Sequence, residues 1–351
     1  MLKVGVVGLA NVGKSTLFNA LTNAGALAAN YPFATIEPNT GIVAVPDERL
    51  KVLGGIYETE KIVPATVEFV DIAGLIAGAS KGEGLGNKFL AHIRECEIIC
   101  HVVRVFHDDN ISHVADNVNP KNDIETIEAE LALADIETLE KFLPKLQRDT
   151  KSGDKVAIAQ KEAAERVLER LKRGERNVEN VDGLQLLSAK PVVVTFNLDE
   201  NELVDEGLKA ELAGMVAPLR SVFVNAKLEE EMAEMNEGER KEFLESYGVE
   251  EDGLNQLIRV AYETLGLQSY LTAGKKEVRA WTIRKGVTAP EAAGVIHTDF
   301  ERGFIAAQVC GYDDLVRLGS ERAVREAGLM RTEGKGYVVQ EGDVIEFRFA
   351  I

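Results

Sequence analysis

Cysteine is scarce in this sequence. Only Cys96, Cys100 and Cys310 occur among its 351 residues. Three cysteines give no even set for a disulfide framework, and their spacing matches no zinc-binding pattern. Cys96 and Cys100 stand one helical turn apart and are expected to pack as small apolar groups. The composition therefore excludes a disulfide-stabilised secreted domain and predicts a protein of the reducing cytoplasm.

Long apolar runs and an excess of basic charge are also missing. Hydrophobic residues make up 45% of the chain, yet no run approaches the roughly 18 uncharged apolar residues that span a bilayer. The formal net charge of -18 argues against nucleic-acid binding over the whole surface but leaves room for a local basic face. The sequence thus predicts no membrane partner and no DNA partner.

A phosphate-binding loop is present near the N-terminus. Residues 8–15 read Gly-Leu-Ala-Asn-Val-Gly-Lys-Ser, between an apolar strand over 4–7 and a helix-like segment over 16–21. In such a loop backbone N–H groups converge on a polyphosphate, the lysine reaches the terminal phosphates and the hydroxyl contacts Mg²⁺. We therefore expect a catalytic role for Lys14 and metal binding by Ser15, and the apolar start of the chain is not a secretory signal. The residues expected to contact the phosphates are Asn11, Val12, Gly13, Lys14, Ser15 and Thr16.

A carboxylate motif follows downstream. Residues 67–70 form a short apolar strand that ends at Asp71 and continues as Ile-Ala-Gly. A carboxylate at such a strand end can hold a magnesium-bound water. Between the two motifs, residues 30–35 form a turn-rich segment whose Thr35 could reach the metal once a γ-phosphate is bound. The sequence predicts a Mg²⁺ site made by Ser15, Thr35 and Asp71.

Two further motifs follow strands in the second half of the chain. Residues 191–195 lead into Phe-Asn-Leu-Asp-Glu at 196–200, and residues 221–224 lead into Asn-Ala-Lys at 225–227. Four motifs in this order, each at the end of a predicted strand, specify an α/β fold. It is the doubly wound, mainly parallel sheet of P-loop NTPases, with nucleotide at its carboxyl edge. The residues expected near the base are Asn197, Leu198 and Ala226.

Together these motifs and the tail over 280–349 closely resemble the YchF-type Obg-like ATPases. The resemblance covers nearly the whole chain. It is carried by the phosphate loop and by segments 30–39 and 71–86, where the ordinary GTPase pattern is altered at particular places. The resemblance implies an enzyme of the translation-associated P-loop class that uses ATP rather than GTP and docks on a ribosome.

The base-recognition motif is the most consequential alteration. Guanine-specific enzymes place Asn, Lys and a terminal Asp here, whereas this chain has Leu198 at the lysine position and Glu200 at the end. A carboxylate suits the N–H groups of guanine but repels the unprotonated ring nitrogen of adenine, while the amide of Asn197 can pair with adenine. Two alternatives stay open. Asp199 is the terminal acid if the turn slips by one residue, or both acids merely open a polar loop.

The hydrolytic position is altered as well. Many GTPases have a glutamine here that orients the attacking water, but this chain has Leu75. The resemblance implies that a loop histidine, His113, takes over, since a neutral imidazole can position or accept a proton from water. A solvated bystander is the alternative for a lone loop histidine. His101, within the apolar run 98–103, is expected to be a satisfied core residue.

Asn11 has two interpretations. In potassium-dependent relatives of the GTPase class, an asparagine at this position helps to hold a monovalent cation between phosphates. Alternatively, Asn11 only tolerates a tight turn. The expected cofactor is therefore Mg²⁺, with K⁺ left open as a second ion.

A long insertion separates the second motif from the third. The stretch from Asp71 to Asn197 is roughly twice as long as a simple GTPase fold needs. Apolar residues repeat at three and four positions on either side of a break at 151–154, which predicts a helical hairpin with coiled-coil character. The first arm is acidic and the second basic, so most charges are expected to neutralise each other, while spare ones could contact ribosomal RNA. The apolar positions are Ile124, Ile127, Leu131 and Ala134, then Ala159, Ala163, Val167 and Leu171. The basic positions are Lys161, Arg166, Arg170, Lys172, Arg173 and Arg176.

The C-terminal part predicts a separate small domain. Residues 277–283, 304–310 and 344–349 read as strands, and Thr-Ala-Pro-Glu at 288–291 reads as a capped helix start. A helix embraced by a small mixed sheet is a ubiquitin-like β-grasp. The segment resembles the TGS domain of Obg-like proteins and threonyl-tRNA synthetases, which is usually linked with RNA or ribosome contact.

The sequence therefore predicts three domains and one main function. The domains are a nucleotide-binding domain over 1–120 and 190–266, a coiled-coil domain over 121–189 and a TGS β-grasp domain over 267–351. The expected protein is a cytoplasmic ATP hydrolase that associates with the ribosome and acts as a nucleotide-dependent switch in translation or stress response. One alternative is a GTPase ribosome assembly factor with relaxed base choice. Another is a nucleotide-gated binding scaffold with negligible turnover.

Overall fold

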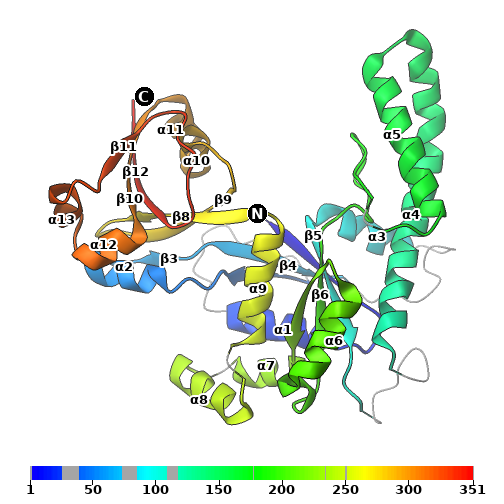
Figure 1. Ribbon diagram of the computed structural model, residues 1–351, viewed down its shortest axis with the longest axis horizontal. Helices are drawn as coiled ribbons and strands as arrows, with labels where there is room; N and C mark the ends of the chain where they lie inside the picture. The colour runs from blue at the N-terminus through cyan, green and yellow to red at the C-terminus, as the bar shows by residue number, and fades with distance from the viewer. Residues whose placement is uncertain are drawn as a thin grey trace. The chain divides into compact units, whose positions relative to one another are not determined.

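The chain forms two compact units in a computed structural model (Figure 1). The first contains residues 1–43 and 68–257, and the second contains residues 44–67 and 258–351. The structure describes residues 2–25, 39–72, 85–108, 118–176, 178–233, 235–249 and 251–350. Among the helices in those ranges, none is both long and apolar enough to cross a lipid bilayer.

A six-stranded sheet forms the centre of the first unit, in the order β2-β4-β1-β5-β6-β7. Strand β1 pairs in parallel with β4 on one side and β5 on the other, and β5, β6 and β7 continue in parallel. All the polar motifs therefore meet at one carboxyl edge, which confirms the predicted doubly wound fold. The strands are β1 (Lys3–Val7), β2 (Thr40–Ala44), β4 (Thr66–Asp71), β5 (Ile98–Arg104), β6 (Val192–Asn197) and β7 (Arg220–Val224).

Helices cover both faces of this sheet. Figure 1 shows α1 on one side of the strands and α4 with α6 on the other. On the second face Val103, Val194 and Phe196 pack against Ile124 of α4 and Leu212 of α6. The helices of this unit outside the insertion are α1 (Lys14–Gly25), α3 (Leu85–Glu95), α6 (Glu206–Val216), α7 (Ala226–Met232) and α8 (Glu237–Tyr247). A short 3-10 helix spans Glu202–Val204, and α9 (Gly253–Thr264) begins in this unit and continues into the second.

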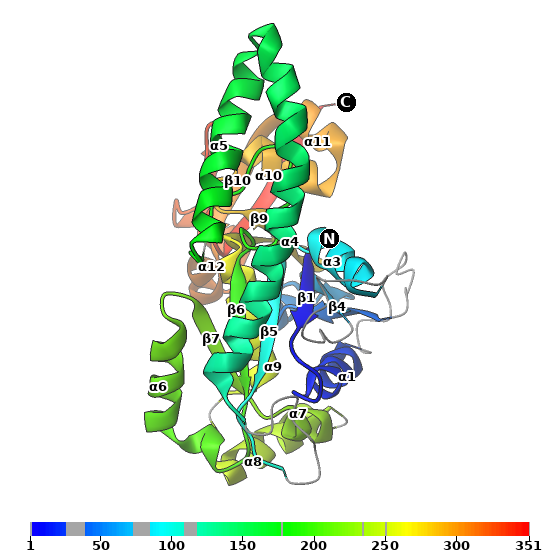
Figure 2. The same cartoon turned by 90° about the vertical axis from the view of Figure 1, so that its right-hand side faces the viewer.

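The insertion between β5 and β6 is a helical hairpin, as predicted (Figure 2). Its arms are α4 (Pro120–Asp149) and α5 (Lys155–Lys172), joined by a 3-10 turn over Thr150–Ser152. The side chain of Asp154 caps α5 by accepting from the Val156 N–H. The break at 151–154 thus ends one helix and starts the next.

The apolar register of the hairpin differs from the predicted one in two places. Ile124 packs into the core of the sheet, so the first turns of α4 belong to the nucleotide unit. In α5 the buried alanines are Ala157 and Ala164, whereas Ala159 is exposed and Ala163 only half-buried. Several small alanines close together in the sequence do not show which of two neighbouring stripes faces the partner helix. The hairpin core is formed by Leu139, Leu146, Ala164, Val167, Leu171, Val178, Val181 and Leu186.

The basic residues of the second arm are paired with carboxylates. Lys172 reaches Glu140 across the hairpin at 2.6 Å, and Arg170 pairs with Glu175 at 2.8 Å on its own side. Each of the other basic positions named above also lies within 4.0 Å of a glutamate. Such exposed pairs contribute little stability, but they supply the expected neutralisation. The pairing therefore does not support a spare basic face for RNA.

The second unit is built on a sheet in the order β11-β10-β12-β8-β9-β3. Strands β8 and β12 run in parallel at its centre, and each pairs with an antiparallel neighbour, β9 or β10. This is the strand order of a β-grasp, as predicted. The strands are β3 (Ile62–Val63), β8 (Leu267–Ala273), β9 (Val278–Arg284), β10 (Phe304–Gly311), β11 (Arg331–Glu333) and β12 (Asp343–Phe349). The helices are α2 (Arg49–Tyr57), α10 (Ala289–Ile296), α11 (Thr298–Arg302), α12 (Tyr312–Leu318) and α13 (Glu321–Glu326).

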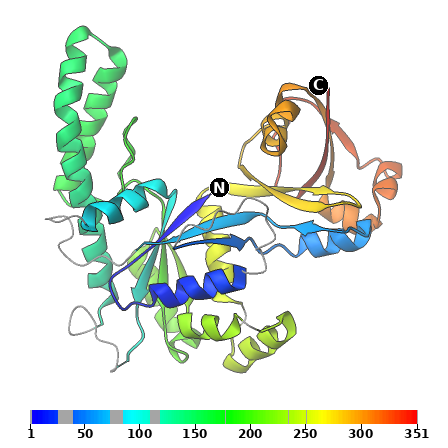
Figure 3. The same cartoon turned by 180° about the vertical axis from the view of Figure 1, so that it is seen from behind.

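Residues 44–67 join this second unit, which differs from the boundaries expected from the sequence. Strand β3 adds to the edge of the sheet in parallel with β9, and Leu50 and Leu53 of α2 pack on Leu271 and Val278. Figures 1 and 3 show α2 with α12 on one side of β8 and β9, and α10 on the other. The β-grasp core is therefore completed by a segment that precedes it by about two hundred residues.

Candidate functional site

A cavity of about 760 Å³ lies at the carboxyl ends of β1, β5, β6 and β7. It brings together the phosphate loop and the two motifs that follow β6 and β7. Open α/β sheets bind ligands at this edge, and the volume suits a molecule of nucleotide size. The cavity is lined by Asn11, Gly13, Lys14, Ser15, Thr16, Phe106, His107, Asp108, Asn197, Leu198, Asp199, Glu200, Asn201, Asn225, Ala226, Lys227 and Glu230.

The phosphate loop has a conformation that only glycine permits at Gly13. The φ angle of Gly13 is 93°, and a Cβ there would lie 2.2 Å from Nδ2 of Asn197. Gly8 is equally restricted, because a Cβ would lie 2.4 Å from the Val102 carbonyl. Asn11 adopts a left-handed φ of 61°, a conformation that asparagine tolerates better than most residues. The turn interpretation of Asn11 accounts for this geometry, and potassium binding stays untested.

Asn197 joins the phosphate loop to the start of α7. Its side-chain amide donates to the Val12 carbonyl at 3.0 Å, and its Oδ1 accepts from the Ala226 N–H at 3.0 Å. The side chain is only 4% exposed. Both polar atoms therefore hold the walls of the cavity together, a task that the base-pairing hypothesis did not include.

Lys14 is a buried residue of the phosphate loop. Its ammonium donates to the Leu9 carbonyl, which bends the side chain back over the loop. Burial lowers the pKa of Lys14 to about 8, and the nearby charge of Asp71 partly opposes this shift. A bound phosphate would supply the negative charge that favours the protonated form. Lys14 lines the cavity, and its catalytic role stays a prediction.

Asp71 is the last residue of β4, and its side chain is half-buried. Its Oδ1 is buried and has no hydrogen-bond partner among the residues that the structure describes. Burial raises the pKa of Asp71, and the charge of Lys14 opposes that rise. An oxygen left in this state fits a magnesium-bound water better than a purely structural role. Ser15 lines the cavity with an exposed side chain, so the donor set fits Mg²⁺.

The acidic residues of the base motif have different environments. Oδ1 of Asp199 accepts from the N–H groups of Asn201 and Glu202, both at 2.9 Å, and so caps its own turn. Glu200 is exposed at the cavity wall, and Leu198 is 1% exposed. Oδ1 of Asp199 is thus engaged in its own turn, and both acids line the cavity, so the choice of terminal acid stays a prediction.

The segment Phe106 to Asp108 is a wall of the cavity that sequence reasoning missed. It follows β5, and the N–H groups of Val105 and Phe106 both donate to the Asn197 carbonyl, at 2.9 and 3.2 Å. The only sequence signal was its place directly after a buried strand at the carboxyl edge. It carries no motif of its own.

Three predicted residues lie outside the described part of the chain: Thr35, Leu75 and His113. His101 is described and is buried in β5, where burial and the positive charge of Lys14 lower its pKa to about 4. The expectation of a satisfied core histidine was wrong in one respect. Its Nε2 has no hydrogen-bond partner among the described residues.

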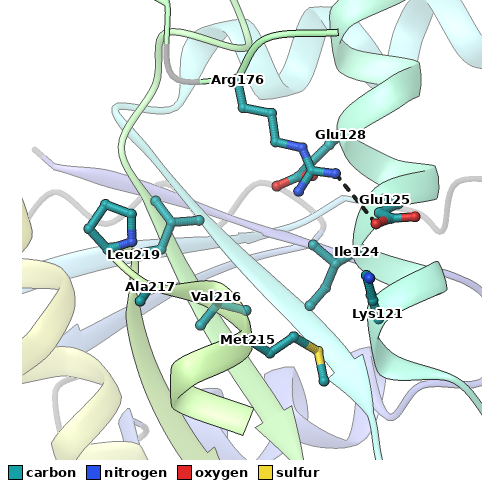
Figure 4. Close-up of a pocket in the computed structure, with 10 residues that line it drawn as sticks. Lys121, Ile124, Glu125, Glu128, Arg176, Met215, Val216, Ala217 and Leu219 are labelled. Atoms are coloured by element: carbon teal, nitrogen blue, oxygen red, sulfur yellow. Dashed lines mark ion pairs between the residues drawn. The ribbon is translucent and has the colours of Figure 1, made fainter. Parts of the chain in front are cut away.

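A second, smaller cavity of about 120 Å³ lies between the start of α4 and the end of α6 (Figure 4). Arg176 covers it and pairs with Glu128 at 2.5 Å and with Glu125 at 3.8 Å. Met215 and Leu219 form its apolar floor. It holds none of the phosphate-loop or base-motif residues and is too small for a nucleotide.

Two family models match the chain. One, described as "50S ribosome-binding GTPase", matches residues 3–142. The other, YchF-GTPase_C, is described as "Protein of unknown function (DUF933)" and matches residues 267–350. The first match covers β1 to β5 and most of α4 but ends before β6 and β7, and the second covers β8 to β12 of the β-grasp.

Curated relatives and a solved structure are similar over the whole length. The "Ribosome-binding ATPase YchF" of Bacillus subtilis is 50% identical over 366 residues and covers 100% of both chains. The protein of the same name from Haemophilus ducreyi is 51% identical over 364 residues, with 99% of each chain covered. The structure described as that of the Schizosaccharomyces pombe YchF GTPase has a TM-score of 0.87 and 37% identity, and covers 99% of this chain and 97% of that one. These names differ in the nucleotide, so base preference stays open.

Proposed function

The chain belongs to the YchF family, and from that premise we propose that it is a ribosome-associated ATPase of the cytoplasm. It binds ATP with Mg²⁺, hydrolyses it to ADP and phosphate, and presents different surfaces to the ribosome in the two states. The observation that carries this proposal is the cavity that unites the phosphate loop and Lys14 with the base motif after β6. The relatives named as ribosome-binding ATPases support it.

The residues of the cavity would divide the work between phosphate, metal and base. The backbone N–H groups from Asn11 to Thr16 would hold the phosphates, and Lys14 would stabilise the terminal ones. Ser15 and Asp71 would hold Mg²⁺, which neutralises charge on the phosphate oxygens when bound, with Thr35 as a further ligand. The residues that would contact the base are Leu198, Ala226 and Glu200, with Asn197 fixing their positions.

ATP is expected to bind more tightly than GTP. Leu198 stands in place of the lysine of guanine-specific enzymes, and Glu200 is exposed at the cavity wall, where its longer side chain can turn away from adenine. Replacing Leu198 by Lys together with Glu200 by Asp should shift the preference toward GTP by about tenfold, or about 1.4 kcal/mol. The shift is expected because the change restores the acceptor for guanine. Affinities for both nucleotides would be measured side by side, with Glu206→Asp as a matched control. A wild-type protein that binds GTP about tenfold more tightly would contradict this preference.

His113→Ala is expected to slow ATP turnover by about a hundredfold and to change ATP affinity by less than about threefold. The reason is that Leu75 has no polar group to orient water, so His113 would act on the water and not on the nucleotide. Turnover would be measured with and without ribosomes. His92→Ala is the control, because His92 is an exposed histidine of the same unit. Unaltered turnover of His113→Ala in both conditions would remove the residue from the mechanism.

Ribosome association is expected to depend on the bound nucleotide. An ATP analogue and ADP should give at least about a threefold difference in co-sedimentation with ribosomes, because a switch must differ in what it binds. The co-sedimentation experiment uses the full chain and not a truncated one. Deleting residues 267–351 would strip Leu50, Leu53 and Ala65 of their core partners and expose them. Equal co-sedimentation in both nucleotide states at physiological salt would contradict the switch. The chain would then be an enzyme, or a protein that binds ribosomes regardless of its nucleotide.

A further inference from the structure

Arg104 is a fully buried arginine at the carboxyl end of β5, next to the nucleotide cavity. It is 1% exposed and is one of the largest completely buried side chains among the described residues. A guanidinium group carries five N–H donors and a permanent charge. Burying it is unfavourable unless those donors find acceptors. Its acceptors therefore indicate what the side chain does.

Three backbone carbonyls accept from three different nitrogens of Arg104. Nε donates to Phe106 at 3.1 Å, and Nη2 donates to Asp108 at 3.2 Å. Nη1 makes the longest contact, 3.5 Å to the carbonyl of Asn11. The guanidinium carbon also lies 4.3 Å from the centre of the Phe106 ring, in cation-π geometry.

These contacts tie together two walls of the cavity that are far apart in the sequence. Asn11 stands in the phosphate loop with its left-handed φ of 61°. Phe106 and Asp108 form the wall segment after β5, and all three residues line the cavity. Since Arg104 itself is fixed in the β5 ladder opposite Asn197, one rigid side chain holds both walls against the sheet.

We propose that Arg104 is a positioning residue that sets the wall segment Phe106–Asp108 in register with the phosphate loop. The proposal rests on the nucleotide site described above and adds a residue that acts without touching the ligand. A nucleotide then binds to two walls that are already placed for its base and its phosphates. A ligand that consists of phosphate alone needs only the loop.

Lysine cannot replace arginine in this role. Its ammonium is a single point that reaches one or two carbonyls, whereas the planar guanidinium fork reaches three directions at once. Arg104→Lys keeps the positive charge but removes some of the hydrogen bonds that hold the wall segment Phe106–Asp108. Arg104→Lys should therefore weaken the binding of ligands that carry a base more than the binding of a ligand that consists of phosphate alone.

The test compares two probes, MgADP and Mg-tripolyphosphate, binding to the full chain by calorimetry. Arg104→Lys is expected to weaken MgADP about tenfold and Mg-tripolyphosphate less than about threefold. Arg94→Lys is the control, because Arg94 is a half-buried arginine of the same unit that bonds Thr138 away from the cavity. It should change neither affinity. Equal weakening of both probes by Arg104→Lys, or no weakening of either, would overturn the proposal.

A second measurement does not depend on the variant folding. Hydrogen exchange of the backbone amides of residues 105–108 is followed in the wild type, with and without saturating Mg-tripolyphosphate. If Arg104 couples the two walls, filling the phosphate loop alone slows exchange in this segment. Unchanged exchange while the probe is bound would overturn the coupling. Failure of the wild type to bind either MgADP or Mg-tripolyphosphate would instead overturn the proposed nucleotide function.

Discussion

Gly13→Ala is expected to reduce nucleotide affinity by at least about a hundredfold, equivalent to about 2.7 kcal/mol. A Cβ at this position would lie 2.2 Å from Nδ2 of Asn197, and the φ of 93° is itself unfavourable for alanine. The clash pushes apart Asn197 and the phosphate loop, which its amide joins through the Val12 carbonyl. Both the phosphate and the base side of the cavity then lose their positions. Titration with MgATP and MgADP measures the effect.

Gly214→Ala is the matched control for this substitution. Gly214 lies within α6, and a Cβ there meets nothing within 4 Å. Alanine favours a helix by about 1 kcal/mol over glycine, so this variant should keep its affinity and be no less stable. If Gly13→Ala melts like the wild type and still binds MgATP within about threefold of it, the loop is not the phosphate site.

The sheet and its site edge could be predicted because the signals are local. Each parallel strand is a short apolar run that ends in a polar motif, and strand order follows from the nucleotide-binding pattern. The predicted strands over 4–7, 67–70 and 221–224 differ from the observed ones by no more than one residue at either end. Cap residues such as Asp154 likewise mark the hairpin turn within the sequence itself.

The contents of the second unit could not be predicted in the same way. Nothing in residues 44–67 distinguishes an edge strand of one sheet from an edge strand of the other, because Ile62 and Val63 suit either. The choice is made by long-range packing of Leu50 and Leu53 on β8 and β9, which periodicity does not reveal.

The candidate site likewise contains residues that the local sequence predicts and residues that only the fold reveals. The phosphate loop and Asp71 carry residue types that are informative by themselves. Asn197 lines the cavity, as its position after β6 predicts, but its side-chain hydrogen bonds go to Val12 and Ala226. Phe106 and Arg104 carry no motif, so their importance follows only from what the fold brings near them.

Asp71→Asn is expected to slow Mg²⁺-dependent ATP hydrolysis by about a hundredfold or more. The amide keeps the shape of the side chain but removes the charge that would hold a metal-bound water. Oδ1 is buried without a hydrogen-bond partner among the described residues, so the oxygen is available for that water. Burial raises the pKa of Asp71, which means that the charge is already disfavoured in the folded chain. The neutral amide should therefore not lower the melting temperature.

The metal dependence separates this role from a general loss of structure. Asp71→Asn should need a higher Mg²⁺ concentration for half-maximal turnover, while its affinity for ADP without Mg²⁺ stays within about threefold of wild type. Asp154→Asn is the control, because asparagine also caps a helix and Asp154 lies at the far turn of the hairpin. Its Mg²⁺ dependence should match that of the wild type. If Asp71→Asn hydrolyses ATP at the normal rate with normal Mg²⁺ dependence, the carboxylate at the end of β4 has no part in holding the metal.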